Sequence, residues 1–275
     1  MITFDFHALK GNDIALKNHF CIARRATAFL LLLFLSSSAY GDFTEPVVDS
    51  IYVSGDFPLS ENKLLSGTGL KSGVSLLRIT PVQVREGIIT NLNDIGYLDA
   101  AVTVQWPLWD DETDIVRISV EAGVRSLLSG LVFNGAVVFT ADSLAMVYPG
   151  IPGESITPAD TLAFRNSILD MYDERGYINS SVDINLLGIS EVDRETGYRA
   201  LECDIVENEQ VILGNISITG LETIRATVIS REILIQPGDS LNMELLRQSV
   251  SNIYGLGLFQ DVRFAYNPDE NDSST

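Results

Sequence analysis

Histidine and cysteine, which carry much enzymatic chemistry, are scarce in this chain, and three of the four lie near its amino-terminal end. Both histidines, His7 and His19, fall in that region, and of the two cysteines only Cys203 lies in the main part of the sequence. A Ser-His-Asp triad, a Cys-His dyad and a histidine-containing zinc site all need a histidine beside their other members. No carboxylate is paired with a base, a nucleophile or a glycine-rich phosphate loop at a meaningful spacing. The sequence therefore predicts no catalytic, cofactor-binding or metal-binding residues, and a protein that is not an enzyme.

Cys203 has a structural interpretation. It stands at the centre of residues 201–205, where apolar residues alternate with Glu202 and Asp204 as in a strand with one buried face. A lone cysteine in such a segment is more often a small core residue than a thiol nucleophile. We therefore expect Cys203 to lie in a hydrophobic core.

Residues 1–41 have the composition of a secretory signal peptide. A basic stretch comes first, an apolar run covers residues 26–35, and small residues follow. A membrane anchor is the alternative, but ten apolar residues span only about half of a bilayer core of roughly 30 Å. We expect cleavage after Gly41 and therefore secretion across the inner membrane into the periplasm. The basic residues of this segment are Lys10, Lys17, Arg24 and Arg25.

Removal of this segment leaves a strongly acidic chain. The full sequence has 18 basic and 37 acidic residues; the segment takes four and two of them, which leaves 14 and 35 and a net charge of −21. Such a chain cannot neutralise phosphates, so nucleic acid is excluded as a partner. Adsorption to anionic lipid is disfavoured for the same reason. The charge mainly keeps the protein soluble.

Three landmarks recur along the rest of the chain, and they define a repeat. Each copy has an apolar strand that ends in glycine, a glycine turn before a helix and a glycine after that helix. The first and second copies are offset by 80 residues at all three landmarks. The glycines are Gly55, Gly73 and Gly96 in the first copy, Gly135, Gly153 and Gly176 in the second, and Gly220, Gly238 and Gly257 in the third.

Within each copy the pattern predicts a strand, a short helix, a long helix and one or two strands. Thr80-Pro81 and Thr157-Pro158 are typical of a helix N-cap followed by proline. After the closing glycine, strands are expected over residues 101–106, 181–186 and 261–266, with further strands over 114–120 and 198–206. The apolar stripe of the long helix is expected at Val84, Ile88 and Leu92, at Phe164, Ile168 and Tyr172, and at Leu245, Val250 and Ile253.

These features together resemble the POTRA domain of the outer-membrane protein assembly factors, the BamA and TamA superfamily. The resemblance rests on the glycine-ended first strand, the Pro-Gly-Glu or Pro-Gly-Asp turn, and residues 171–177 and 253–262, and it covers about residues 46–275. It implies an α+β fold, a tandem array of three β-α-α-β-β domains. The expected boundaries are 46–123, 124–209 and 210–275.

The third copy is expected to be incomplete. The acidic turn over residues 267–272 is followed by only three residues, so the last strand of the unit has no sequence to form it. We interpret the chain as a truncated form of a longer one. In a β-α-α-β-β sheet the last strand lies between the other two, so the strands at 216–219 and 261–266 should lack their shared partner.

The resemblance implies a periplasmic docking arm in outer-membrane protein assembly and insertion, associated with the outer membrane. Its partners would be unfolded outer-membrane protein chains, accessory periplasmic lipoproteins and a C-terminal or separate membrane β-barrel. The alternatives are the arm of a two-partner-secretion-type transporter and a periplasmic scaffold module.

Adding a strand to an exposed sheet edge would bind chains of many sequences, because main-chain hydrogen bonds supply the affinity. The strand after the closing glycine is the edge that the resemblance implies. The docking hypothesis concerns the backbone of this strand. Its inward side chains are expected to face the core. Trp106 and Trp109, which flank Pro107, are a possible partner contact, with capping of the local core as the alternative. The candidate docking residues are Val102, Val104 and Trp106, then Val182, Ile184 and Leu186, then Val262 and Phe264.

Overall fold

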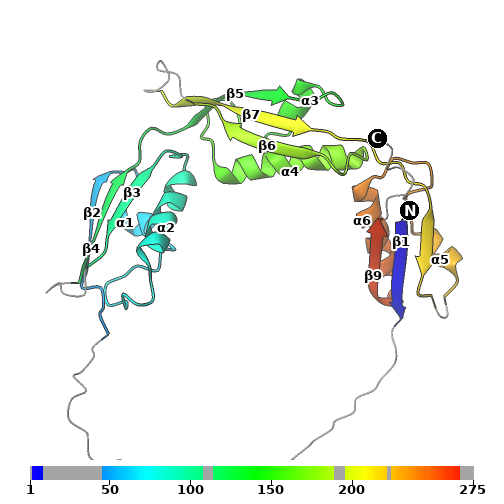
Figure 1. The fold of residues 1–275 in the computed structure, drawn as a ribbon, viewed down its shortest axis with the longest axis horizontal. Helices are drawn as coiled ribbons and strands as arrows, with labels where there is room; N and C mark the ends of the chain where they lie inside the picture. Colours follow the sequence, from blue (N-terminus) through cyan, green and yellow to red (C-terminus); the bar gives the residue numbers. More distant parts are fainter. Residues whose placement is uncertain (1, 9–44, 108–113, 189–195, 222–223, 267–275) are drawn as a thin grey trace, which may run out of the picture.

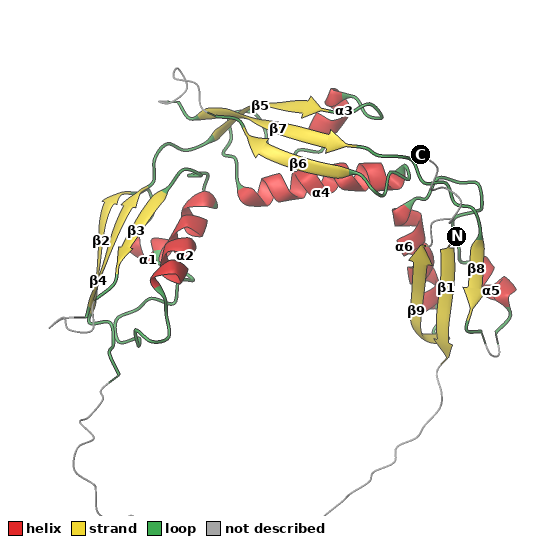
Figure 2. Ribbon diagram, viewed as in Figure 1, coloured by secondary structure: helices red, strands yellow, loops and turns green. Residues whose placement is uncertain are grey.

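Three small sheets, each with helices packed on one face, follow one another along the chain (Figures 1 and 2). The computed structural model describes residues 2–8, 45–107, 114–188, 196–221 and 224–266. Figure 1 shows the three sheets arranged as an arch, with the second at its top. No helix among the described residues combines the length and apolar character needed to cross a membrane.

The first repeat has its closing strand in the middle of the sheet. The strand order is β2-β4-β3, with β4 parallel to β2 and antiparallel to β3. This arrangement satisfies the backbone of β4 on both sides and leaves β2 and β3 as edges. The elements are β2 (Ser50–Asp56), α1 (Glu61–Leu64), α2 (Pro81–Asn93), β3 (Ala101–Gln105) and β4 (Ile115–Glu121).

The second repeat has the same topology in the order β5-β7-β6. Its central strand is again parallel to the first strand and antiparallel to the strand that follows the long helix. The β-α-α-β-β order expected from the sequence is therefore present in both repeats. The elements are β5 (Leu127–Asn134), α3 (Ala141–Ala145), α4 (Pro158–Glu174), β6 (Ser181–Leu186) and β7 (Tyr198–Val206).

In the third repeat the central strand comes from the amino-terminal end of the chain. The order is β8-β1-β9, in which β1 (Ile2–Ala8) pairs in parallel with β8 (Ile216–Thr219) and antiparallel with β9 (Phe259–Tyr266). The expectation that the centre of this sheet stands open is therefore wrong for the full chain, because residues 2–8 fill it. The helices of this repeat are α5 (Ala226–Ser230) and α6 (Met243–Gly255).

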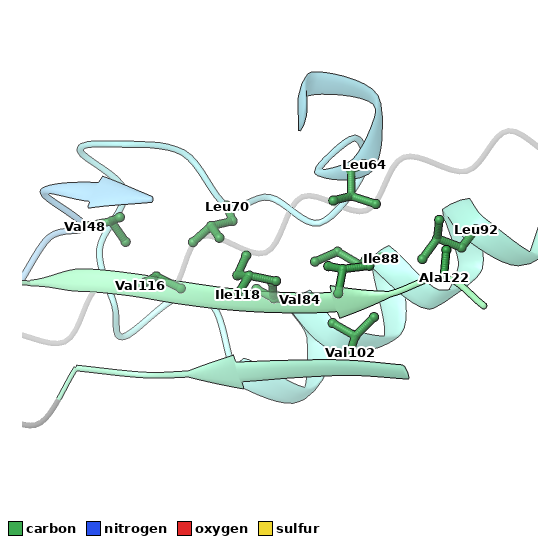
Figure 3. Packing of buried hydrophobic residues seen from close by; sticks show 11 residues of the cluster. Val48, Leu64, Leu70, Val84, Ile88, Leu92, Val102, Val116, Ile118 and Ala122 are labelled. Atoms are coloured by element: carbon green, nitrogen blue, oxygen red, sulfur yellow. The ribbon is translucent and has the colours of Figure 1, made fainter. Parts of the chain in front are cut away.

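Each sheet packs against its helices through a separate hydrophobic core. In the first repeat, Val116 and Ile118 of β4 meet Leu64 of α1 and Ile88 of α2, all at most 1 % exposed. Figure 3 shows these side chains converging from the sheet and the two helices into one cluster. The second core contains Cys203, which is fully buried, as expected. Burial, and then the nearby Asp204 and Glu202, raise the pKa of its thiol to about 12, so the residue stays an unreactive thiol.

The long helices begin as the sequence predicts. Thr80 Oγ1 accepts a hydrogen bond from the Gln83 N–H, and Gln83 Oε1 accepts one from the Thr80 N–H, which completes a capping box. Thr157 accepts from the Asp160 N–H in the same position of α4. In both helices proline follows the cap, where a missing N–H costs nothing because that N–H has no partner in a helix.

The apolar stripe is confirmed in α2 and α4 and is partly wrong in α6. Leu246, Ser249 and Ile253 are the buried residues of α6, whereas Leu245 and Val250 are only partly buried. Ser249 occupies a core position because its hydroxyl donates to the Leu245 carbonyl and accepts from the Leu234 N–H. A polar residue inside the stripe hid the true helix face from a search for apolar spacing.

The second repeat caps the end of the first. The Ser126 N–H donates to the Gly96 carbonyl (2.7 Å), and Arg125 Nε donates to the Ile95 carbonyl (3.0 Å). The last carbonyls at a helix end have no partner inside the helix. These bonds therefore satisfy the end of α2 with groups from the next repeat.

The junction between the second and third repeats is built in the same way. The Val211 N–H donates to the Gly176 carbonyl and Gln210 Nε2 to the Arg175 carbonyl, both at 2.8 Å. Asn242 Nδ2, in the cap of α6, donates to the Glu174 carbonyl (2.9 Å). The two junctions thus repeat one arrangement, which favours a semi-rigid arm over repeats that move independently of one another.

Glu207, just after β7, fastens three parts of the second repeat. Its Oε1 accepts the N–H groups of Val137 (2.7 Å) and Val138 (2.8 Å) and the hydroxyl of Tyr172 (2.7 Å). Burial acts to raise the pKa of the Glu207 carboxyl, but these hydrogen bonds together hold it below its usual value. Burial, and then the bond to Glu207, raise the pKa of the Tyr172 hydroxyl, so it remains a donor.

A lowered folded-state pKa predicts a pH-dependent contribution from Glu207. Its stabilisation is present above the unfolded-state pKa of about 4.3 and is lost as pH falls through the folded-state pKa. Glu207→Gln keeps an acceptor but removes the charge, so we expect about 1 kcal/mol less stability in the second repeat at pH 7. The deficit should shrink towards zero at pH 3, as measured by thermal unfolding. Glu209→Gln, two residues along at an exposed site, is the matched control, and a deficit that is independent of pH would contradict the assignment.

Candidate functional site

The strand that follows each long helix lies at an edge of its sheet. These strands are β3, β6 and β9, and among the described strands each pairs on one side only. All eight candidate side chains from the sequence lie on or just after them. The buried ones are Val102, Val182 and Val262, and those packed partly buried against the cores are Val104, Trp106, Ile184, Leu186 and Phe264. The side chains thus serve the cores, and what the described residues leave unpaired in β3 and β6 is one side of the backbone. In β9 the Val262 N–H donates to the Tyr254 hydroxyl.

The direction of the free backbone groups can be derived for β6. In an antiparallel pair, the N–H and C=O of one residue point to the same side, and neighbouring residues alternate. The Leu187 N–H, just beyond β6, donates to the Ala200 carbonyl of β7, so the odd-numbered residues of β6 face β7. The backbone groups of Val182, Ile184 and Leu186 therefore face away from the sheet, where another strand could pair with them.

One of these outward groups is occupied by a side chain. Arg165 of α4 donates from Nε to the Val182 carbonyl at 2.7 Å. A charged residue at an edge strand protects it against unwanted pairing. Arg165 therefore covers the first outward position of β6, and an incoming strand that pairs there must displace it.

A groove of about 440 Å³ runs between α4 and β6. Its walls are mostly apolar. On the helix side Leu162 is 56 % exposed, because it lies outside the buried face of α4, which is formed by Phe164, Ile168 and Tyr172. Leu98, which follows the long helix of the first repeat, also lines it. The groove thus places an apolar surface directly beside the free backbone of the strand.

The first repeat has a smaller version of the same groove. It measures about 230 Å³ and lies between α2 and β3, with Val82, Arg85 and Val104 among its walls. Val82 is 58 % exposed, in the place that Leu162 takes in α4. The Arg85 guanidinium donates to its neighbour Glu86 at 2.8 Å.

Sequence reasoning missed the helix side of these grooves. Val82 and Leu162, and likewise Arg85 and Arg165, are 80 residues apart, which is the offset of the repeat. An apolar residue outside the core stripe that recurs at the repeat offset is a signal for a shared surface. The search for core positions passed over it because it looked only for residues on the buried face.

The first and second repeats are also joined by an ion pair near this groove. Arg199 of β7 pairs with Asp99, which follows the long helix of the first repeat. The Arg199 side chain is buried and that of Asp99 is exposed.

Of the two tryptophans, Trp106 packs partly buried on the first core, as the core-capping interpretation expects, and Trp109 lies outside the described residues.

Comparison with known proteins identifies the fold. Residues 211–274 match the POTRA family model, described as a surface antigen variable number repeat. POTRA domains 3–5 of BamA from Haemophilus influenzae superpose with a TM-score of 0.54 at 16 % identity, over 84 % of this chain and 95 % of that one.

A curated relative agrees with this result. A Treponema pallidum protein named as an outer membrane protein assembly factor is 25 % identical over 218 residues, which is 74 % of this chain. The match spans 25 % of the relative's own length. The α+β fold is that of BamA POTRA domains, and the third repeat matches the POTRA family model itself.

Proposed function

We propose that this chain is a periplasmic docking arm that binds extended, unfolded outer-membrane protein chains by strand addition, with the edge of β6 as its main site. The observation that carries the proposal is the free backbone of Ile184 and Leu186 beside an apolar groove. Main-chain pairing supplies affinity that does not depend on the guest sequence, and the groove accepts alternate apolar side chains.

The binding step has a defined order on this surface. An extended chain first pairs with the outward backbone groups of Ile184 and Leu186. Among the described residues, the side-chain bond to this edge is that of Arg165, and it goes to Val182. Extension of the ladder to Val182 then releases Arg165 from the carbonyl. The smaller groove beside β3 offers a second, weaker position for the same chain.

The relative and the amino-terminal segment support the proposed periplasmic location of the arm. A relative named as an outer membrane protein assembly factor supports the choice of cargo, and a cleaved signal over residues 1–41 would deliver the arm to the periplasm. Accessory periplasmic lipoproteins are the second class of partner. In this proposal residues 46–123, 124–209 and 210–275 act as three consecutive domains of one arm.

A proline in β6 tests the site without breaking the sheet. Ile184→Pro removes an N–H that points away from β7, a position at which edge strands tolerate proline. We expect at least about tenfold weaker binding, about 1.4 kcal/mol or more, of an uncharged eight-residue peptide that alternates valine and threonine. Fluorescence anisotropy with a labelled peptide measures the affinity, and the absence of charge prevents generic attraction to the acidic chain.

The matched control is Ile184→Ala, which trims the same side chain but keeps the N–H. It should bind the peptide within about threefold of the unchanged chain, since main-chain pairing is intact. Thermal unfolding of both variants checks that the second repeat remains folded. Equal peptide affinity for Ile184→Pro and Ile184→Ala would show that the β6 edge is not the docking site.

A further inference from the structure

The face of the second sheet that its helices leave open carries acidic side chains. Side chains along a strand alternate between the two faces of its sheet. Because Val182 and Ile184 pack on the second core, the exposed Asp183 between them lies on the opposite, open face. Glu202 and Asp204 of β7 lie on the same face, since they alternate with the buried residues of that strand. The open face of this sheet is therefore acidic.

Amide side chains hold the two carboxylates of β7. Asn134 of β5 donates from Nδ2 to Glu202 (3.0 Å) and to Asp204 Oδ1 (2.9 Å). Asn185 of β6 donates to the other oxygen of Asp204, at 3.2 Å. An amide is a neutral donor. These bonds therefore orient the carboxylates and leave their negative charge in place.

Asp183 is the acidic residue closest to the open edge, and it lies directly opposite another carboxylate. It pairs in register with Asp204 across β6 and β7. Like charges directly opposite one another in a sheet are destabilising. Among the described residues, no side chain forms a hydrogen bond or ion pair with the Asp183 carboxylate. A cation beside Asp183 would offset this repulsion, and the side away from β7 is the position of a docked strand.

A strand added to β6 brings its own side chains beside Asp183. The backbone groups of Ile184 point outward, so an antiparallel guest exchanges hydrogen bonds with that residue. The guest residue opposite Asp183 then forms a non-hydrogen-bonded pair, the kind in which side chains come closest. Paired residues share a face. The guest residue opposite Ile184 therefore enters the apolar groove, and the one opposite Asp183 lies on the acidic face.

The first repeat does not have this charge at the corresponding place. Thr103 of β3 stands 80 residues before Asp183, and it pairs with Ser119 of β4. Gln105, the next residue of β3 on that face, lies opposite Arg117. Both edges have a groove beside an unpaired side of the backbone, but their open faces differ in charge. A preference for the charge of the guest therefore belongs to the second repeat.

We propose that Asp183 selects the chains that dock at the β6 edge: it favours extended segments in which apolar residues alternate with lysine or arginine, and disfavours those that alternate with aspartate or glutamate. This inference rests on the proposed docking function and adds the class of chain that docks. Glu202 and Asp204 lie one strand further from the guest and add a weaker attraction. At 0.15 M salt, exposed charges more than about 8 Å apart are largely screened, so the nearest carboxylate dominates.

Three peptides test the selection. Each has eight residues, with valine at every second position and threonine, lysine or glutamate between the valines. We expect the lysine peptide to bind about tenfold more tightly than the glutamate peptide at pH 7 and 0.15 M salt, with the threonine peptide between them. Asp183→Asn should reduce this ratio at least about threefold and leave the affinity for the threonine peptide unchanged. Fluorescence anisotropy measures all the affinities.

Two controls separate local pairing from the attraction of a cation to an acidic protein. Glu209→Gln removes the same charge at an exposed position beyond β7 and should leave the ratio unchanged. A peptide of four valines followed by four lysines has the charge of the alternating peptide but cannot place valine and lysine on opposite faces of one strand. It should bind at least about fivefold more weakly. Thermal unfolding should show that Asp183→Asn is at least as stable as the unchanged chain, because the like-charge pair is gone.

Two results would overturn the proposal. One is a ratio that changes equally, or not at all, in Asp183→Asn and Glu209→Gln; the other is equal affinity for the block and alternating lysine peptides. Ile184→Pro distinguishes this failure from failure of the docking function. If the β6 edge docks chains without selecting their charge, Ile184→Pro weakens all three alternating peptides while Asp183→Asn leaves their ratio as it was. If the β6 edge is not the docking site, Ile184→Pro leaves all three affinities unchanged.

Discussion

Replacing Gly135 by alanine is expected to unfold the second repeat at a much lower temperature. Gly135 follows β5 with φ +79°, and an added Cβ would stand 2.1 Å from the carbonyl oxygen of Ile205 on the central strand. That oxygen belongs to the backbone, so the strand itself would have to move. The left-handed conformation alone costs roughly 1–2 kcal/mol, and the displaced strand should bring the loss to about 3 kcal/mol or more.

Gly130→Ala in the same strand is the matched control. An added Cβ there meets nothing within 4 Å, and Gly130 does not have a positive φ. We expect a change of at most about 0.5 kcal/mol in either direction. Calorimetry of the two variants measures the difference, and similar melting temperatures would contradict the close approach of Gly135 to the central strand.

The same geometry explains why this glycine recurs in the sequence. At Gly55 of the first repeat, an added Cβ would lie 1.9 Å from the Val120 carbonyl oxygen, with φ +116°. The repeat pattern predicted a strand ending in glycine from local spacing alone. It did not predict the reason, because the contact joins residues about 65 to 70 positions apart through the parallel pairing of β2 with β4 and β5 with β7.

Other parts of the fold could be predicted because they depend on local signals. Helix caps at Thr80 and Thr157 and the apolar stripes of α2 and α4 depend on residues within one or two turns, and the structure confirms them. The central strand of the third sheet depends on a pairing between the two ends of the chain. The local pattern of residues 2–8 does not indicate which strands this segment pairs with, because main-chain pairing is almost independent of sequence.

The candidate site was predictable to a similar extent. The sequence located β6 and its core-facing side chains, since period-two alternation is a local property. The groove beside it needs α4 and β6 at a fixed separation, and the Arg165 bond to the Val182 carbonyl joins residues 17 positions apart across two elements. That geometry is set by packing of the second core, which no spacing rule specifies.

Gly176→Val is expected to loosen the junction between the second and third repeats as well as the end of α4. Gly176 has φ +84°, and its added Cβ would lie 3.1 Å from the Leu241 nitrogen, the Ser240 Cβ and the Val211 oxygen, all in the third repeat. The backbone conformation alone should cost about 1–2 kcal/mol in the second repeat. The two branched methyl groups must then push residues 211 and 240–241 away, which breaks the bond from the Val211 N–H to the Gly176 carbonyl.

Gly257→Val separates the two effects. Gly257 closes α6 with φ +68°, and an added Cβ there meets nothing within 4 Å, so only the backbone cost applies. Spin labels at exposed Ser129 and Ser251, in a background with Cys21 replaced by serine, report the distance between the second and third repeats; buried Cys203 stays unlabelled because burial raises the pKa of its thiol to about 12. We expect Gly176→Val to broaden that distance distribution and Gly257→Val to leave it unchanged, although both lower a melting temperature. If both variants leave the distribution narrow, the glycine contact does not set the angle of the arm, and the side-chain bonds from Gln210 and Asn242 to the end of α4 must hold the junction without it.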